Sequence, residues 1–97
     1  VLPAKISGNR YVIAVSTSGS VPAVSRLVRE EIEKTFPDLD DLILLGEWIR
    51  DIYRGDRAGT ESYDTVLYTV LRDPETRKAL TNGMNAAREY VQRRFAL

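Results

Sequence analysis

The pattern of hydrophobic and polar positions begins with a strand-like period. Residues 4–7 and 10–16 form two short strand-like runs, joined at Gly8 and Asn9, where either residue adopts a positive φ at little cost. In the second run, hydrophobic residues occupy both sets of alternating positions, so both faces are expected to be at least partly covered. This pattern predicts a β-hairpin. Because a two-stranded hairpin is marginal in water, we expect a partner sheet or another domain to complete it.

From Val21 onward the hydrophobic period becomes that of an α-helix. The first predicted helix has Ser20 or Val21 at its N-cap and Pro22 in its first turn, and it ends before Pro37. Its hydrophobic stripe consists of Val24, Leu27, Val28, Ile32 and Phe36. Charged residues occupy the opposite side, so the pattern predicts an amphipathic helix.

The second predicted helix, residues 38–54, carries two hydrophobic stripes. One has a coiled-coil-like spacing, and the other consists of Leu44 and Trp48. Two stripes indicate contact on two sides, and in so short a chain we expect the second contact to be with another subunit. Trp48 and Tyr53 are interpreted as core or interface anchors rather than as residues that stack on a cofactor.

Three further helices complete the pattern. One follows Ser62, a short one opens at Asp73-Pro74-Glu75 and stops at Asn82-Gly83, and the last covers residues 84–95. The predicted fold class is therefore α+β and mostly helical, with an N-terminal β-hairpin followed by about five α-helices.

The length and the change of period also predict the organisation of the chain. Residues 1–37 would form the hairpin, a loop and the first helix, and residues 38–97 would form a helical C-terminal segment. With 97 residues, the chain has enough surface to bury one modest core, which favours one compact domain overall.

Composition excludes several kinds of site. Fourteen acidic residues balance fourteen basic ones, so no net field attracts nucleic acid or an anionic membrane. The absence of cysteine and histidine excludes zinc sites and Ser-His or Cys-His nucleophile pairs within this chain. Its longest hydrophobic run is far shorter than a membrane span. We expect a cytoplasmic protein that binds neither nucleic acid nor a membrane.

The residues between the second strand and the first helix provide the strongest local signal. This loop contains Ser16, Thr17, Ser18, Gly19 and Ser20. Backbone N–H groups and hydroxyls beside the positive end of a helix dipole suit a phosphate or a carboxylate. The spacing matches neither the dinucleotide nor the Walker motif. Two interpretations stay open, an anion-holding loop and a plain strand-to-helix turn.

Charged residues near this loop have simpler interpretations as well. The basic residues that lie near it in sequence are Lys5, Arg10, Arg26 and Arg29. They are suited to binding carboxylates, although exposed basic residues are commonly only solvated. The carboxylates of Asp38, Asp40 and Asp41 suit a hard cation, but charge compensation at a helix N-terminus is the better interpretation.

An ordered set of short motifs resembles a known family. The motifs are Pro3-Ala4, Ala14-Val15-Ser16-Thr17, Gly19, Pro22 and Arg26-Leu27-Val28-Arg29-Glu30. In this order they resemble the central segment of siroheme synthases, and residues 63–92 look like the helical end of short microbial members. Two positions differ, because the family has Gly-Gly at Ser18-Gly19 and a small polar residue at Val21.

The resemblance implies an enzyme that, when intact, oxidises precorrin-2 to sirohydrochlorin with NAD and inserts ferrous iron. It implies that the hairpin pairs across a homodimer and that the loop residues from Ser16 to Ser20 hold carboxylates of the tetrapyrrole substrate.

The resemblance also implies where the catalytic groups lie. In the family, the NAD-binding domain and the catalytic aspartate precede the segment that begins at Pro3. We therefore expect this chain to be a dimerisation and helical portion without catalytic, cofactor-binding or metal-binding residues, and to be inactive alone. A second hypothesis is a stand-alone interaction module that binds a protein partner or a small anion without catalysis.

Overall fold

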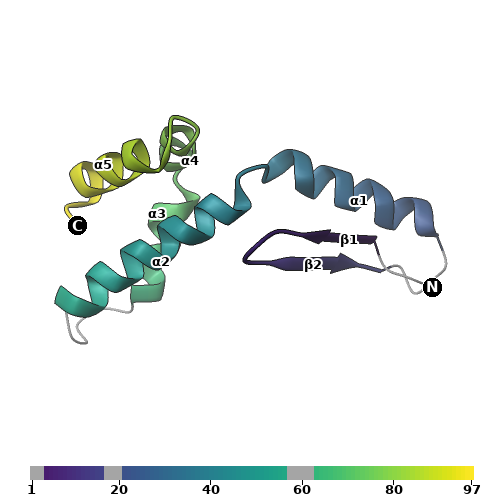
Figure 1. Cartoon of the computed structure of the whole chain (residues 1–97), viewed down its shortest axis with the longest axis horizontal. Coiled ribbons are helices and arrows are strands. Elements are labelled where there is room, and N and C mark those ends of the chain that lie inside the picture. Colours follow the sequence, from purple (N-terminus) through teal and green to yellow (C-terminus); the bar gives the residue numbers. More distant parts are fainter. Residues whose placement is uncertain (1–3, 17–20, 57–62) are drawn as a thin grey trace. The chain divides into compact units, whose positions relative to one another are not determined.

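The fold consists of a hairpin followed by helices (Figure 1). A computed structural model describes residues 4–16, 21–56 and 63–97. These residues form two strands and five helices, which confirms the predicted α+β class. The chain divides into two compact units, Val1–Asp40 and Asp41–Leu97. That the chain forms one domain overall stays a prediction.

In the first unit, a helix covers one face of the hairpin. Strands β1 (Ala4–Ser7) and β2 (Val12–Val15) pair antiparallel, with Ala4 opposite Val15 and Ile6 opposite Ile13. Directly opposite residues point to the same face, and Ile6 on this face is only 8% exposed. Helix α1 (Pro22–Thr35) runs along the hairpin and packs on both strands (Figure 1).

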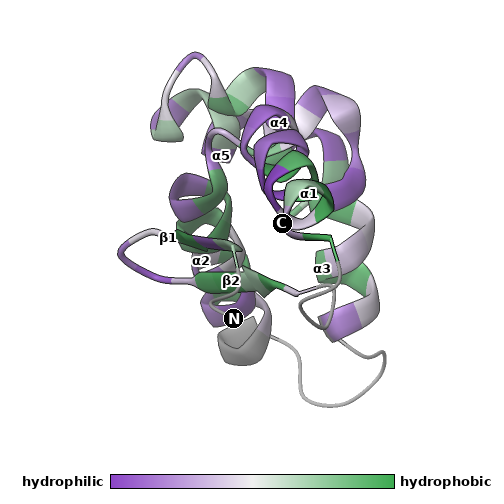
Figure 2. Cartoon of the chain, turned by 90° about the vertical axis from the view of Figure 1, so that its right-hand side faces the viewer, coloured by the Kyte–Doolittle hydropathy of each residue, from purple (hydrophilic) through white to green (hydrophobic). Residues whose placement is uncertain are grey.

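Several hydrophobic side chains of the first unit stay exposed. Strand β2 is hydrophobic along its whole length (Figure 2), yet Val12 is 66% exposed because it points away from α1. On α1, Val24, Leu27 and Val28 are exposed, and Ser25 is the buried residue. The predicted stripe is therefore only partly buried, because its hydrophobic arc is wider than the area that two strands cover.

In the hairpin turn, Gly8 lies close to the side chains of Tyr11 and Asp40. The Gly8 N–H donates to the Tyr11 carbonyl at 3.0 Å. Neither Gly8 nor Asn9 has a positive φ. The prediction that these residues occur in the turn because they adopt a positive φ at little cost is therefore wrong. Instead, a Cβ at Gly8 would overlap Tyr11 Cε1 and lie 2.7 and 2.9 Å from the Asp40 carboxylate oxygens. A side chain at position 8 would therefore displace the Tyr11 ring or the Asp40 carboxylate.

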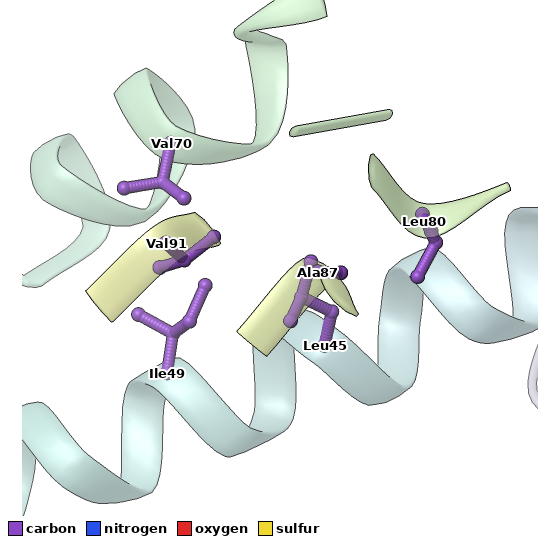
Figure 3. Packing of buried hydrophobic residues seen from close by; sticks show 6 residues of the cluster. All are labelled: Leu45, Ile49, Val70, Leu80, Ala87 and Val91. Atoms are coloured by element: carbon purple, nitrogen blue, oxygen red, sulfur yellow. The ribbon is translucent and has the colours of Figure 1, made fainter. Parts of the chain in front are cut away.

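The second unit is a helical bundle around its own core. Its helices are α2 (Leu39–Asp56), whose first two residues belong to the first unit, α3 (Tyr63–Arg72), α4 (Pro74–Leu80) and α5 (Met84–Phe95). Side chains from all four helices converge in Figure 3, where Val70 and Ile49 lie on either side of Val91. The buried hydrophobic residues of this core are Leu45, Ile49, Val70, Leu80, Ala87 and Val91.

The helix boundaries of the second unit follow local signals. Asp73 caps α4 by accepting a hydrogen bond from the Glu75 N–H at 3.1 Å, and Pro74 takes the first helical position, as predicted. Gly83 precedes α5 with φ of 111°, a conformation that is accessible almost only to glycine. The predicted stop at Asn82 and Gly83 is therefore confirmed.

The second stripe of α2 meets partners within its own unit. Trp48 packs against the core, and the guanidinium of Arg88 lies 5.1 Å from the centroid of its ring. Tyr53 is 6% exposed. Trp48 thus has partners within its own unit, and contact of this stripe with another subunit stays a prediction, whereas the interpretation of both aromatic residues as packing anchors is confirmed. Within the described ranges, no helix has the length and apolar character that crossing a membrane requires.

Candidate functional site

The candidate loop connects the end of β2 to the start of α1. Ser16 follows β2 directly and is exposed. The other four predicted binding residues lie outside the described residues; they are Thr17, Ser18, Gly19 and Ser20. The structure thus places the two ends of the loop, and the role of its five residues stays a prediction.

The helix that follows the loop presents its N-terminal amides without a carboxylate of its own. Val21 is the N-cap and makes no side-chain cap, and its carbonyl accepts from the Val24 N–H at 3.0 Å. Pro22 takes the first helical position, and the first turn contains no acidic residue. Because the positive end of the helix dipole is not neutralised from within this turn, the position favours an anion.

The predicted basic residues do not all gather at this end of the hairpin. Lys5 pairs with Ala14, two residues before Ser16. Arg10 lies in the hairpin turn, about 20 Å along β2 from Ser16 at 3.3 Å per residue. Arg10 is therefore near the loop in sequence but lies at the other end of the hairpin, because β2 carries the chain away from it.

The two basic residues of α1 differ in their surroundings. Arg26 lies in the N-terminal half of the helix and is exposed. Arg29 Nη1 lies 3.7 Å from Glu33 Oε1, one turn later. Arg29 is thus engaged with its own helix, and Arg26 is the nearer of the two to the loop in sequence.

One of the three acidic residues after α1, Asp40, binds the hairpin turn, which the sequence did not predict. Asp40 Oδ2 accepts from the Asn9 N–H at 3.1 Å, and Oδ1 accepts from the Arg10 N–H at 3.0 Å. One carboxylate thus satisfies two backbone donors of the hairpin turn. In the part of the chain that the structure describes, no three acidic residues gather as metal ligands.

A second carboxylate, Asp73, links α4 to α5. The Tyr90 hydroxyl donates to Asp73 Oδ2 at 2.6 Å. This bond, followed by the one from the Glu75 N–H, lowers the pKa of Asp73 from its usual 3.8. The same bond raises the pKa of Tyr90 above its usual 10.0, because removing the shared proton would place two negative charges together. The cap was readable from Asp73-Pro74-Glu75, but the contact with Tyr90 was not.

The described part of the site therefore has a strand end, an exposed serine and a helix N-terminus whose first turn contains no acidic residue. These groups donate hydrogen bonds, and they suit binding an anion better than transferring a proton near neutral pH. Comparison of the chain with protein-family models, with curated proteins and with solved structures finds no match.

Proposed function

We propose that this chain is the dimerisation and substrate-cleft portion of a siroheme synthase. The intact enzyme oxidises precorrin-2 to sirohydrochlorin with NAD and inserts ferrous iron during siroheme biosynthesis in the cytoplasm. The observation that carries the proposal is the order of the motifs from Pro3-Ala4 to Arg26-Leu27-Val28-Arg29-Glu30. Of their described residues, Ala4 lies on β1, Ala14 and Val15 lie on β2, and residues 26–30 lie on α1.

The exposed surface of the first unit supports a role in dimerisation. Val24, Leu27 and Val28 leave a hydrophobic flank on α1, and Val12 exposes a hydrophobic side chain on the uncovered face of the hairpin. In the residues described, the sheet has two strands, so each strand has an edge without a pairing strand. A second copy that pairs with such an edge would bury hydrophobic surface and satisfy backbone groups.

The position of the loop supports substrate binding. Precorrin-2 carries several carboxylates, which are acceptors for N–H and O–H donors. The loop from Ser16 to Ser20 supplies hydroxyls in sequence, and α1 supplies the positive end of its dipole. In this proposal the loop holds carboxylate arms of the tetrapyrrole and so orients the ring.

The catalytic groups belong elsewhere in this proposal. The chain has no histidine, no cysteine and no glycine-rich dinucleotide motif. NAD binding and the catalytic aspartate would therefore come from the nucleotide-binding domain that the family carries, and this chain would show no dehydrogenase activity by itself.

A chimera tests the proposal. The NAD-binding domain of an established siroheme synthase is joined to this chain, and formation of NADH from precorrin-2 is measured. The chimera is expected to be active, and each part alone is expected to be inactive. Replacing the loop hydroxyls at Ser16, Thr17, Ser18 and Ser20 with alanine should lower kcat/KM about tenfold, a loss of about 1.4 kcal/mol.

Control variants distinguish an effect of the loop hydroxyls from a general effect of replacing hydroxyl residues. Thr65, Thr69 and Thr81 are exposed hydroxyl residues of the second unit, and their replacement with alanine should change kcat/KM less than about twofold. Binding of uroporphyrin, a stable tetrapyrrole polycarboxylate, to the chain itself provides a second measurement. The proposal would be contradicted by two results together: the chain is folded but does not bind uroporphyrin, and the chimera that contains it is inactive.

The exposed flank of α1 also favours the alternative, a non-catalytic module that binds a protein partner. The two functions differ in oligomeric state and in ligand. A monomer at high concentration that binds no tetrapyrrole would favour the interaction module, whereas a dimer that binds uroporphyrin would favour the siroheme synthase portion.

A further inference from the structure

A hollow in the first unit lies at the end of α1 remote from the candidate loop. Its volume is about 260 Å³. The residues that line it are Ile6, Ser7, Tyr11, Ile32, Glu33, Phe36, Pro37 and Leu39. Because α1 has fourteen residues and is about 21 Å long, this hollow is separate from the loop at the helix N-terminus.

Hydrophobic residues and two aromatic rings line the hollow, although the surface open to it is more polar than apolar. Ile6 is buried at 8% exposure, and Ile32 and Leu39 are half-buried. Tyr11 is half-buried and Phe36 is 37% exposed, so ring surface faces the hollow with a part open to solvent. The hydrophobic side chains offer contact to a short alkyl stem, the polar surface suits a charged end group, and the rings attract a cation.

One aromatic ring is held in place before any ligand arrives. The Tyr11 ring lies so close to Gly8 that a Cβ there would overlap it. The same turn is fastened by Asp40, which accepts from the Asn9 and Arg10 N–H groups. Because this wall is fixed, binding would not have to order it.

The charges around the hollow favour a cation. Of its eight lining residues, Glu33 alone has an acidic or basic side chain. Residues 29–40 contain five acidic and two basic residues, so the local charge is negative. Glu33 Oε1 faces Arg29 at 3.7 Å in a pair whose side chains are 47% and 32% exposed, and such pairs are weak. The second carboxylate oxygen of Glu33 provides one acceptor atom. One acceptor suits the compact ammonium of a lysine better than the planar guanidinium of an arginine, which binds a carboxylate through two parallel hydrogen bonds.

We propose that this hollow binds the ammonium group of a lysine side chain presented by a protein partner. The four-carbon stem of the lysine packs on Ile6, Ile32 and Leu39. Its ammonium lies beside the Tyr11 and Phe36 rings and pairs with the Glu33 carboxylate. This inference is independent of the proposed function, since it uses neither the loop nor the hydrophobic flank of α1.

The test compares two probes that differ by one charged group. N-acetyl-lysine methylamide and N-acetyl-norleucine methylamide are titrated into the whole chain, and methyl NMR shifts of Ile6, Ile32 and Leu39 are followed. The lysine probe should bind about tenfold more tightly than the norleucine probe. Glu33→Gln should weaken the lysine probe about fivefold or more, and Phe36→Leu about threefold.

Glu31→Gln is the matched control, because Glu31 lies on the same helix but pairs with Lys34 outside the hollow at 3.8 Å. It should change affinity less than about twofold. Equal binding of the two probes, or equal losses in Glu31→Gln and Glu33→Gln, would overturn the proposal. Tighter binding of N-acetyl-arginine methylamide would overturn the choice of lysine, and about tenfold tighter binding of n-butylammonium would favour a free amine over a protein partner.

Discussion

At the scale of single residues, two carboxylates connect segments that are distant in sequence. Asp40 binds the hairpin turn through the Asn9 and Arg10 amides, 31 and 30 residues earlier. Asp73 caps α4 and accepts from Tyr90, 17 residues later. Both carboxylates satisfy donors that would otherwise need water, so each fixes a junction between two elements.

Gly8 and Gly83 disfavour a side chain for different physical reasons, and a pair of alanine variants separates these reasons. Gly8→Ala should destabilise the hairpin by about 1–3 kcal/mol through overlap with Tyr11 and Asp40. Gly83→Ala should cost about 1–3 kcal/mol through backbone strain, because nothing lies within 4 Å of its Cβ position.

Amide hydrogen exchange distinguishes the two effects. Gly8→Ala should speed exchange of the Asn9 and Arg10 amides, since it displaces Asp40. Gly83→Ala should leave these amides unchanged and serves as the control. Unchanged exchange in Gly8→Ala would show that the turn adapts to the added methyl group.

The Asp73 and Tyr90 pair should make stability depend on pH at both extremes. The pKa of Asp73 is lowered, so its contribution is complete above pH 3.8 and is lost as pH falls through the folded-state pKa. The pKa of Tyr90 is raised, so its contribution is complete below pH 10.0 and is lost as pH rises through the folded-state pKa.

Tyr90→Phe tests this coupling by urea unfolding across the pH range. The variant should be less stable at neutral pH and should lose less stability than the wild type in strong acid and in strong alkali. Tyr68→Phe, at a 66% exposed tyrosine of α3, is the control and should follow the wild-type curve. Parallel curves for Tyr90→Phe and the wild type would contradict the role of the pair.

At the scale of elements, α1 has more hydrophobic surface than its hairpin covers. Ser25 faces the covered side, while Val24, Leu27 and Val28 form an exposed flank. A helix that is hydrophobic beyond its buried face commonly packs against a second surface. The proposed homodimer provides such a surface.

Leu27→Glu tests whether this flank forms the dimer interface. Leu27 is 57% exposed, and burying a leucine contributes about 1.5–3 kcal/mol, so the charge should raise the dimer dissociation constant about tenfold or more in sedimentation equilibrium. Tyr68→Glu alters another exposed hydrophobic residue and should leave the dimer intact. A dimer unaffected by Leu27→Glu would place the interface elsewhere.

At the scale of the whole molecule, the second unit has a core of its own. Side chains of α2, α3, α4 and α5 meet at Ile49, Val70 and Val91, none of which is exposed (Figure 3). A core closed within one unit predicts independent folding of that unit.

Truncation tests this prediction. Residues 37–97, which keep α2 entire, should unfold cooperatively in urea with Trp48 fluorescence as the probe. Ile49→Ala should destabilise this fragment and the whole chain alike, by about 2–5 kcal/mol. A fragment without a cooperative transition would show that the first unit is needed for folding.

Much of the fold was predictable because local signals agree with the tertiary structure. The change of hydrophobic period at Val21 and the Asp73-Pro74-Glu75 cap predicted helix boundaries that the structure has within one or two residues. The candidate loop was predictable only as a sequence of small polar residues, of which the structure places Ser16. Its function rests on the resemblance to siroheme synthases and stays a prediction.

The sequence by itself determined the class of fold, the order of the elements and the exclusion of histidine and cysteine chemistry. These depend on composition and on periods of a few residues, which are local properties. Only the tertiary structure decided that Asp40 and Gly8 meet at the turn, that β2 carries Arg10 away from the loop, and that Trp48 packs within its own unit. Such contacts depend on how segments separated by many residues pack, and no local pattern specifies that packing.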